Sequence, residues 1–453
     1  MGEHLRKLAP IYGFTVSFRK AGGGCFLPGA ERLFYKTNLL ISSHADEIEK
    51  MNEKERLTFV EMLLSKKSEI AKTKLPADID LVYDGWEICA PLHHGEELTE
   101  SQYEGAKGAF TEAVKLNPDN SDALNGLGFL SLWHTKELAD AERMYKHALE
   151  KAAKELDHER VEDVYKCEAC KDSMWAATET RPFMRALEGL AWVYYKEGKV
   201  EEALNGFKKM VELNPGDNQG ARYMIGIVLL KGGISGLLEG GSYQALRFYK
   251  LFPKEEMDPS VQFNLALALF LKGKTDKAAT CLRSAFFSNL YVAPRLIGMS
   301  TFFPLVFEEA KEGMPIVRQK EFEKASRKTI EVIESIKRKE AELKVPISSF
   351  FPEALDIRYY SDTEMLGYAE WYCDECDTLW YRYPKAIGLL RKMWYHPRVI
   401  EEVRSFIDLR KRLKDDTDSQ ETEKLRKAEE ELTNITRIQT TRWKIAEVLE
   451  KKH

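Results

Sequence analysis

Two Cys-x-x-Cys pairs have the spacing of residues that bind metals or carry out redox chemistry. The four residues are Cys167, Cys170, Cys373 and Cys376, with about 200 residues between the two pairs. Four thiolates could hold one structural zinc ion, and either pair alone could exchange between a dithiol and a disulfide. Zinc binding and redox chemistry are therefore the two chemical hypotheses that these residues raise.

Apolar residues at helical spacing flank both pairs and favour a third interpretation. The flanking residues are Val164, Met174, Leu366, Ala369 and Trp380. Cysteine behaves as a small buried residue, so each pair fits the apolar face of a helix. We predict packing rather than metal binding, with no ion shared between the pairs. The alternative is a metalloprotein or enzyme whose site lies near Cys373 and Cys376, among neighbouring aromatic residues.

Other constellations of catalytic residues are missing from the sequence. His93 and His94 precede Glu96 and Glu97 in a segment predicted to be a polar loop. The motifs G-x-S-x-G, H-E-x-x-H and G-x-G-x-x-G do not occur. We predict a protein that is not an enzyme and has no metal and no cofactor.

Composition narrows the class of partner. The chain has 453 residues, of which 44% are hydrophobic and 31% charged, so a sizeable core can form. Lys plus Arg number 68 and Asp plus Glu number 73, a net charge of −5, whereas general nucleic-acid binding requires a basic surface. Apolar runs fall well short of the roughly 20 residues of a membrane span, and no secretory signal is visible. We predict a cytoplasmic protein that does not bind nucleic acid and has no membrane span.

A helical repeat is indicated by the pattern of apolar and small residues. The segment from Met184 to Asp217 contains two amphipathic patterns, separated by Gly198 and closed by Pro215. The first carries Leu187, Leu190, Ala191 and Tyr194, and the second carries Ala203 and Phe207. Two helices of this length cannot bury both apolar faces alone, so they need stacked neighbours.

These residues resemble a tetratricopeptide repeat (TPR), a unit of two antiparallel helices. Partial matches extend the resemblance over roughly Glu100 to Leu290, and one of them has an extra residue in its turn. The matching residues are Ala106, Phe110, Ala113 and Pro118; Leu124, Leu127, Gly128, Ala141, Tyr145 and Ala148; Ala221, Met224 and Val228; and Leu265, Ala266, Leu269, Gly273, Ala278, Leu282 and Ala285. Shorter stretches are similar to uncharacterised microbial repeat-containing proteins, which implies no activity.

The resemblance predicts an all-α fold: a TPR-type α-solenoid of antiparallel helix pairs with an additional helical C-terminal region. The predicted regions are residues 1–99, partly helical and poorly predicted; 100–294, the repeat array; 295–414, a helical C-terminal region; and 415–453, a polar break and a C-terminal amphipathic helix. Within them we expect a strand at 11–18, helices at 45–72 and 319–343, and an irregular segment at 78–95.

The resemblance also indicates where a partner would bind. In TPR arrays the first helix of each unit lines a concave groove. The corresponding residues are Asn125, Phe129, Arg185, Glu188, Trp192, Tyr195, Arg222, Tyr223, Phe263 and Asn264. Aromatic side chains with a few polar groups suit an extended peptide or a helix. We predict a non-catalytic scaffold for another protein or peptide. Alternatively, the chain's own flanking helices cover some of these residues.

Overall fold

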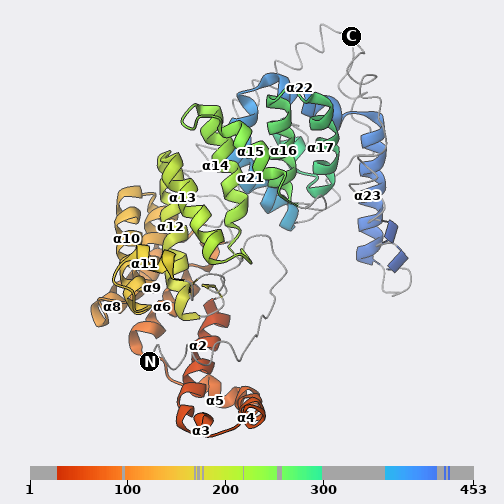
Figure 1. Ribbon diagram of the computed structural model, residues 1–453. Helices are drawn as coiled ribbons and strands as arrows, with labels where there is room; N and C mark the ends of the chain where they lie inside the picture. The colour runs from red at the N-terminus through yellow and green to blue at the C-terminus, as the bar shows by residue number, and fades with distance from the viewer. Residues whose placement is uncertain are drawn as a thin grey trace. The chain divides into compact units, whose positions relative to one another are not determined.

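The computed structural model describes residues 28–93, 97–167, 170, 174–175, 178–217, 219–252, 258–297, 363–415, 423–424 and 427–428. Within these residues every regular element is a helix (Figure 1), which confirms the all-α prediction. The chain divides into two compact units, residues 1–228 and 229–453. No described helix combines the length and apolar character that crossing a bilayer requires.

The first unit begins with four helices: α2 (Pro28–Ser42), α3 (Ala45–Glu49), α4 (Glu53–Ser65) and α5 (Lys67–Lys72). The single helix predicted at 45–72 is wrong, because Asn52 and Lys66 interrupt it. The Asn52 side chain caps α4 by accepting the backbone N–H of Glu55, and the Glu55 side chain accepts the backbone N–H of Asn52 in return. Ile41, Ile48, Val60 and Leu63 form a small core beneath these helices.

Three antiparallel helix pairs follow in the first unit: α6 (Ala77–Ile88) with α8 (Glu100–Leu116), α9 (Ser121–Leu130) with α10 (Leu138–Glu155), and α12 (Arg181–Glu197) with α13 (Val200–Leu213). Short elements connect them: α7 (Ala90–His93), a π-helical turn η2 (Ser131–Thr135), α11 (Val161–Lys166) and the 3₁₀ turn η3 (Thr178–Thr180). This arrangement confirms the antiparallel pairs predicted from the apolar pattern.

Helix α6 corrects the prediction of an irregular segment at 78–95. Asp78, Asp80, Asp84 and Gly85 have low helix propensity, which concealed the helix in the sequence. Burial stabilises it nevertheless, because Val82 and Trp86 pack in one core with Phe110 of α8. Helix α6 is thus the missing first helix of the degenerate unit that α8 completes.

A repeated aromatic–glycine contact stacks the pairs of the first unit. A Cβ atom at Gly126 of α9 would overlap the ring of Phe110, and one at Gly189 of α12 would overlap the ring of Tyr145. Both rings are buried, at 0% and 3% exposure. The same contact therefore recurs at two successive junctions, as a stacked repeat requires.

The second unit is built around helix α16. The division between the units falls within α14 (Ala221–Ser235), and the later helices are α15 (Gly241–Tyr249), α16 (Pro259–Leu271), α17 (Thr275–Ser288), α18 (Val292–Leu296), α21 (Thr363–Tyr381), α22 (Pro384–Trp394) and α23 (Pro397–Asp415). Helix α16 packs against α15, α17 and α21. Because neighbours lie on several sides, α16 is apolar nearly all round and its residues from Pro259 to Leu269 are almost all buried.

Several sequence predictions concern residues outside those that the structure describes. The strand at 11–18 and the helix at 319–343 fall there, as does most of the amphipathic pattern beyond Leu425. The division into four regions stays a prediction.

Candidate functional site: the inner face of the helix pairs

A buried ion-pair cluster connects the inner helices of the first unit. Arg185 of α12 donates to Asp122 of α9, with 2.6 Å between Nη2 and Oδ2. Glu31 of α2 accepts from Arg185 at 3.0 Å. Burial acts to lower the pKa of Arg185, but the charges of Asp122 and Glu31 outweigh it and the pKa is raised. The predicted groove residue Arg185 is therefore held charged within the chain itself.

Helix α2 lies against the first helices of these pairs. Its Arg32 bonds to three acidic residues of α6, namely Asp80, Asp84 and Glu87. Its Glu31 also accepts from Arg181 at the start of α12, at 3.3 Å. A helix of the chain thus occupies part of the face that the sequence predicted to be an open groove.

Two further predicted groove residues make polar contacts within the chain. Asn125 is 0% exposed, and its Nδ2 donates to the carbonyl oxygen of Pro182 at 2.8 Å. Glu188 accepts from Gln219 at 2.5 Å, and burial raises the pKa of its carboxyl to about 7. Neither side chain is positioned to meet a partner while these contacts hold.

Aromatic residues of the inner face gather in η2, just after α9, and near the end of α12: Trp133 and Trp192 are partly exposed, and Tyr195 is buried. The ring of Trp192 lies 5.4 Å from that of Trp133 and 5.6 Å from that of Tyr195, measured between centroids. The exposed Lys196 places its Nζ 5.6 Å from the Trp133 ring and 5.7 Å from the Trp192 ring. We call Trp133, Trp192, Tyr195 and Lys196 the aromatic edge. Phe129, one turn before Trp133, instead packs against Trp86, at 5.4 Å.

Sequence reasoning selected Trp192 and Tyr195 but missed Trp133 and Lys196. Trp133 lies in the π-helical turn η2, where the regular repeat positions used for the prediction no longer apply. Lys196 comes one residue after a predicted groove position. Repeat numbering assumes regular helices, and for this reason it did not select Trp133 and Lys196, which lie at helix ends.

Arg222 and Tyr223 lie in the first turn of α14. Arg222 donates through Nε to Asp217 at 2.6 Å, and its side chain remains 37% exposed. Asp217 also accepts the backbone N–H groups of Ala221 and Arg222, at 2.8 and 3.0 Å. Because Asp217 has these further donors, Arg222 can leave it for an external carboxylate at smaller cost than Arg185 could leave Asp122.

Phe263 and Asn264 are covered by helix α21 of the second unit. Both are 0% exposed. The Tyr372 hydroxyl donates to Asn264 Oδ1 at 2.8 Å and accepts from Trp380 Nε1 at 3.0 Å. This corrects the prediction that the two residues line an open groove, because a flanking helix fills the space. The contact with α21 supports the alternative interpretation, in which the chain's own helices cover some of these residues.

Two comparisons with family models identify the repeats. Models described as tetratricopeptide repeat match residues 96–155 and 185–217. The first segment contains α8, α9 and α10, and the second contains most of α12 and all of α13. The chain contains tetratricopeptide repeats in these two segments. A search of curated proteins found no match. TPR units are typically interaction modules rather than enzymes, so the family indicates a role in protein–protein interaction.

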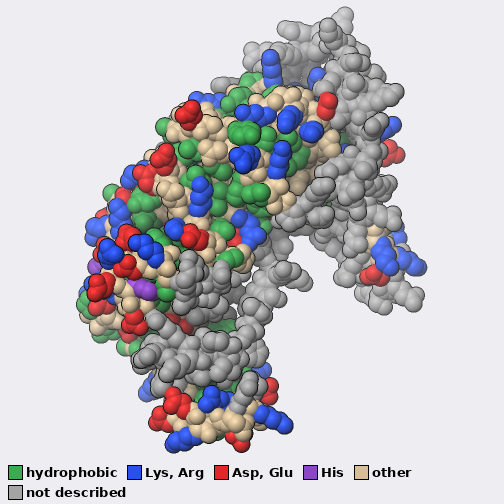
Figure 2. Space-filling view, in the orientation of Figure 1, with side chains coloured by type: hydrophobic (Ala, Val, Ile, Leu, Met, Phe, Trp, Pro, Cys, Tyr) green, Lys and Arg blue, Asp and Glu red, His purple; other side chains and the backbone are tan. Residues whose placement is uncertain are grey.

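The surface charge of the repeat region is mixed. Figure 2 shows acidic and basic side chains interspersed over the drawn face of helices α10 to α13. General nucleic-acid binding would require a basic stripe or patch. The mixed charge of this face does not provide one and instead favours recognition through individual side-chain contacts.

The pair Cys373 and Cys376 lies on helix α21, as predicted. Both residues are buried, and burial raises the pKa of the Cys376 thiol well above its ordinary value. Asn264 Nδ2 contacts Cys376 Sγ at 3.9 Å. A buried thiol that stays protonated is a poor nucleophile and a poor metal ligand, so these contacts favour packing over the alternative of a catalytic or metal site at this pair.

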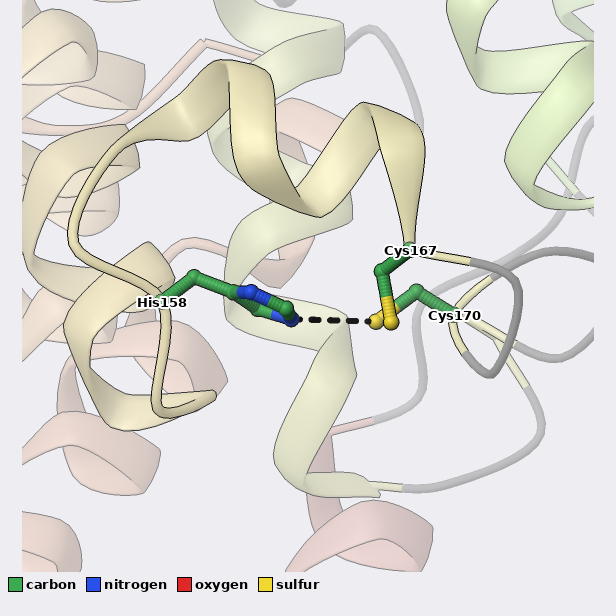
Figure 3. A group of neighbouring side chains, drawn as sticks. All are labelled: His158, Cys167 and Cys170. Atoms are coloured by element: carbon green, nitrogen blue, oxygen red, sulfur yellow. Dashed lines mark hydrogen bonds between the residues drawn. The ribbon is translucent and has the colours of Figure 1, made fainter.

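The pair Cys167 and Cys170 does not lie on a helix, and this prediction was wrong. Helix α11 ends at Lys166, and the backbone N–H of Cys170 donates to the carbonyl oxygen of Cys167 at 3.1 Å in a turn. The spacing of three residues is common to a helix face and to a turn, so spacing alone could not separate them. The turn brings the two thiols towards His158 (Figure 3).

Proposed function

We propose that this TPR protein is a non-catalytic interaction module that binds a helix or peptide of a protein partner along its inner face. The observation that carries the proposal is helix α2. It lies against the inner helices of the same chain, with Glu31 between Arg181 and Arg185 and with Arg32 against the acidic face of α6. The inner face thus already receives one amphipathic helix, which is the helix-in-groove mode of recognition.

The remaining part of the inner face is suited to a partner with apolar and acidic side chains. Trp133 and Trp192 are only partly buried, Lys196 lies over both rings, and Arg222 at the start of α14 is partly exposed. Aromatic residues and arginine contribute most strongly to protein interfaces. By analogy with Glu31, a partner carboxylate would pair with Arg222 while an apolar side chain packs on Trp192.

The direct test is capture of partners by the full-length chain and by a double variant, Trp192→Ala with Arg222→Ala. A matched control is Tyr243→Ala with Arg247→Ala, which removes an aromatic–arginine pair of the second unit whose guanidinium lies 6.0 Å from the ring. We expect wild type and control to capture the same proteins, and the double variant to lose them with an unchanged circular dichroism spectrum.

A single charge reversal, Arg222→Glu, provides a second test that does not depend on whether the Trp192 variant folds. Because Arg222 is partly exposed, reversal should weaken capture while the helices stay intact. Identical capture by wild type, double variant and charge reversal would place the binding surface elsewhere.

A further inference from the structure

Three side chains with metal-binding atoms converge in the first unit, within the segment between the two family matches. The ligand atoms of His158, Cys167 and Cys170 all lie within 4.8 Å of one another, and each residue is half-buried. Cys170 Sγ lies 3.6 Å from His158 Nε2. Figure 3 shows the imidazole and both sulfur atoms pointing towards one point. Cys373 and Cys376 belong to no comparable group among the described residues.

The end of helix α10 fixes the position of His158. Asp157 adopts a left-handed conformation with φ of 59°. Its backbone N–H donates to the carbonyl oxygen of Lys154 at 2.9 Å, and that of His158 donates to Ala153 at 3.0 Å. These two bonds form a Schellman cap, so the backbone that carries His158 is anchored to the last turn of α10.

The end of helix α11 fixes the two cysteines in a similar way. The backbone N–H of Cys167 donates to the carbonyl oxygen of Val164 at 3.2 Å, and Val164 is 0% exposed. Figure 3 shows both sulfurs on the side facing His158. Neither cysteine forms a disulfide. A Cys-x-x-Cys turn of this kind can wrap two thiolates around one ion.

The spacing agrees with tetrahedral zinc coordination. Zinc–sulfur bonds of ~2.3 Å and zinc–nitrogen bonds of ~2.0–2.1 Å at the tetrahedral angle place sulfur and nitrogen about 3.6 Å apart. The distance between Cys170 Sγ and His158 Nε2 is 3.6 Å before any ion is bound. Magnesium and calcium prefer oxygen ligands, whereas two thiolates and an imidazole select zinc.

We propose that His158, Cys167 and Cys170 bind one zinc ion, with the fourth position open to water or another ligand. Binding would convert two thiols to thiolates and release their two protons to solvent. The ion would join the end of α10 to the end of α11 and so fix the connection between the two matched repeats. This site was missed in the sequence because the residues were assigned to a helix face.

The proposal is tested first on the wild-type full-length chain. The protein is reduced, freed of metal with a chelator and titrated with Zn²⁺. We expect one zinc per chain by elemental analysis, and about two protons released per zinc in a weakly buffered solution. Titration with Co²⁺ should give the thiolate-to-cobalt absorption of a tetrahedral site. Failure to bind zinc, or a Cys167–Cys170 disulfide that forms readily and leaves zinc binding unaffected, would overturn the proposal.

Variants then assign the ligands. Cys167→Ser, Cys170→Ser and His158→Asn should each weaken zinc binding by at least about 100-fold, the upper end of what loss of a supporting residue causes. Matched controls are His147→Asn, an exposed histidine of α10, and Cys281→Ser, a half-buried cysteine of α17. The controls should bind zinc like wild type. Equal affinity in the ligand variants and the controls would show that the zinc lies elsewhere.

Discussion

In each unit another helix packs on the inner helices, but the two packing helices are held by different kinds of contact. In the first unit, helix α2 is joined to the inner helices by charged groups, with Glu31 and Asp122 on Arg185. In the second unit, helix α21 covers α16 with apolar side chains and a neutral network through Tyr372. The contact of α2 with the inner helices therefore depends on charge, whereas the contact of α21 with α16 depends on apolar packing and neutral hydrogen bonds.

The two Cys-x-x-Cys pairs show the same contrast. In the second unit Cys373 and Cys376 are buried on a helix. In the first unit Cys167 and Cys170 lie in a turn beside His158. The same four-residue motif is thus part of a core in one place and a potential metal site in the other, and the local backbone decides between them.

The largest effect should come from breaking the charged contact of the first unit. Arg185→Met would leave Asp122 buried without its cation and Glu31 with Arg181 alone, and we expect a loss of about 3–5 kcal/mol in the free energy of unfolding. Urea unfolding followed by tryptophan fluorescence measures it. The control Arg222→Met should cost about 1 kcal/mol or less, because that side chain is partly exposed and Asp217 keeps its backbone donors. Equal losses would contradict the assignment of Arg185 as the central cation.

A pH-dependent effect should come from a buried carboxyl of the first unit. Burial raises the pKa of Glu188 from 4.5 to about 7, so between these values the folded state binds more protons than the unfolded state. Stability should therefore fall as pH rises from 4.5 to 7. Glu188→Gln keeps an acceptor for Gln219 and removes this titration, and it should be more stable than wild type by up to about 3 kcal/mol at pH 8.

Unfolding measured at pH 5 and pH 8 tests this expectation. Part of the wild-type slope should remain in the variant, because burial also raises the pKa of Glu155 to about 7. Glu202→Gln, an exposed change on α13, is the control and should leave the slope unaltered. A wild-type slope that survives unchanged in Glu188→Gln would show that this carboxyl does not titrate as described.

The smallest effect should come from the neutral network of the second unit. Tyr372→Phe removes the donor to Asn264 and the acceptor for Trp380, and we expect a loss of about 1–3 kcal/mol. The loss should be the same at pH 5 and pH 8, because burial raises the pKa of Tyr372 well above its ordinary value. Tyr381→Phe is the control, since that side chain is 51% exposed. A loss that varies with pH would mean that charge takes part in this contact too.

The helix pairs could be predicted because their signal is local. Leu187, Ala191 and Phe207 repeat at helical spacing within one unit, and all three are buried as expected. Helix α6 was not predicted because its polar and glycine residues lower helix propensity. Burial of Trp86 offsets that low propensity only in the folded chain. Packing between segments that are distant in sequence produces no pattern that can be seen in a short stretch of residues.

The contacts of the candidate site could be predicted only in part. Arg185 was selected from its place in the repeat, but its partner Glu31 lies 154 residues away in sequence and carries no local signal. Likewise, nothing near Asn264 indicates that Tyr372 will bond to it. Repeat position therefore identifies which side chains face inward, and tertiary packing determines which of them are already occupied.

The π-helical turn at Ser131–Thr135 has a consequence for how such a chain can change over evolutionary time. The unit has one residue more than the repeat pattern, and the widened turn absorbs it, ending at Lys136, whose backbone N–H bonds back to Ser131. Beyond it, Ala141, Tyr145 and Ala148 keep their buried places, at 0%, 3% and 0% exposure. An insertion in the middle of a helix would rotate every later side chain away from its neighbours. Here the extra residue is confined to a helix end, so gain or loss of one residue at this turn should leave the stack undisturbed.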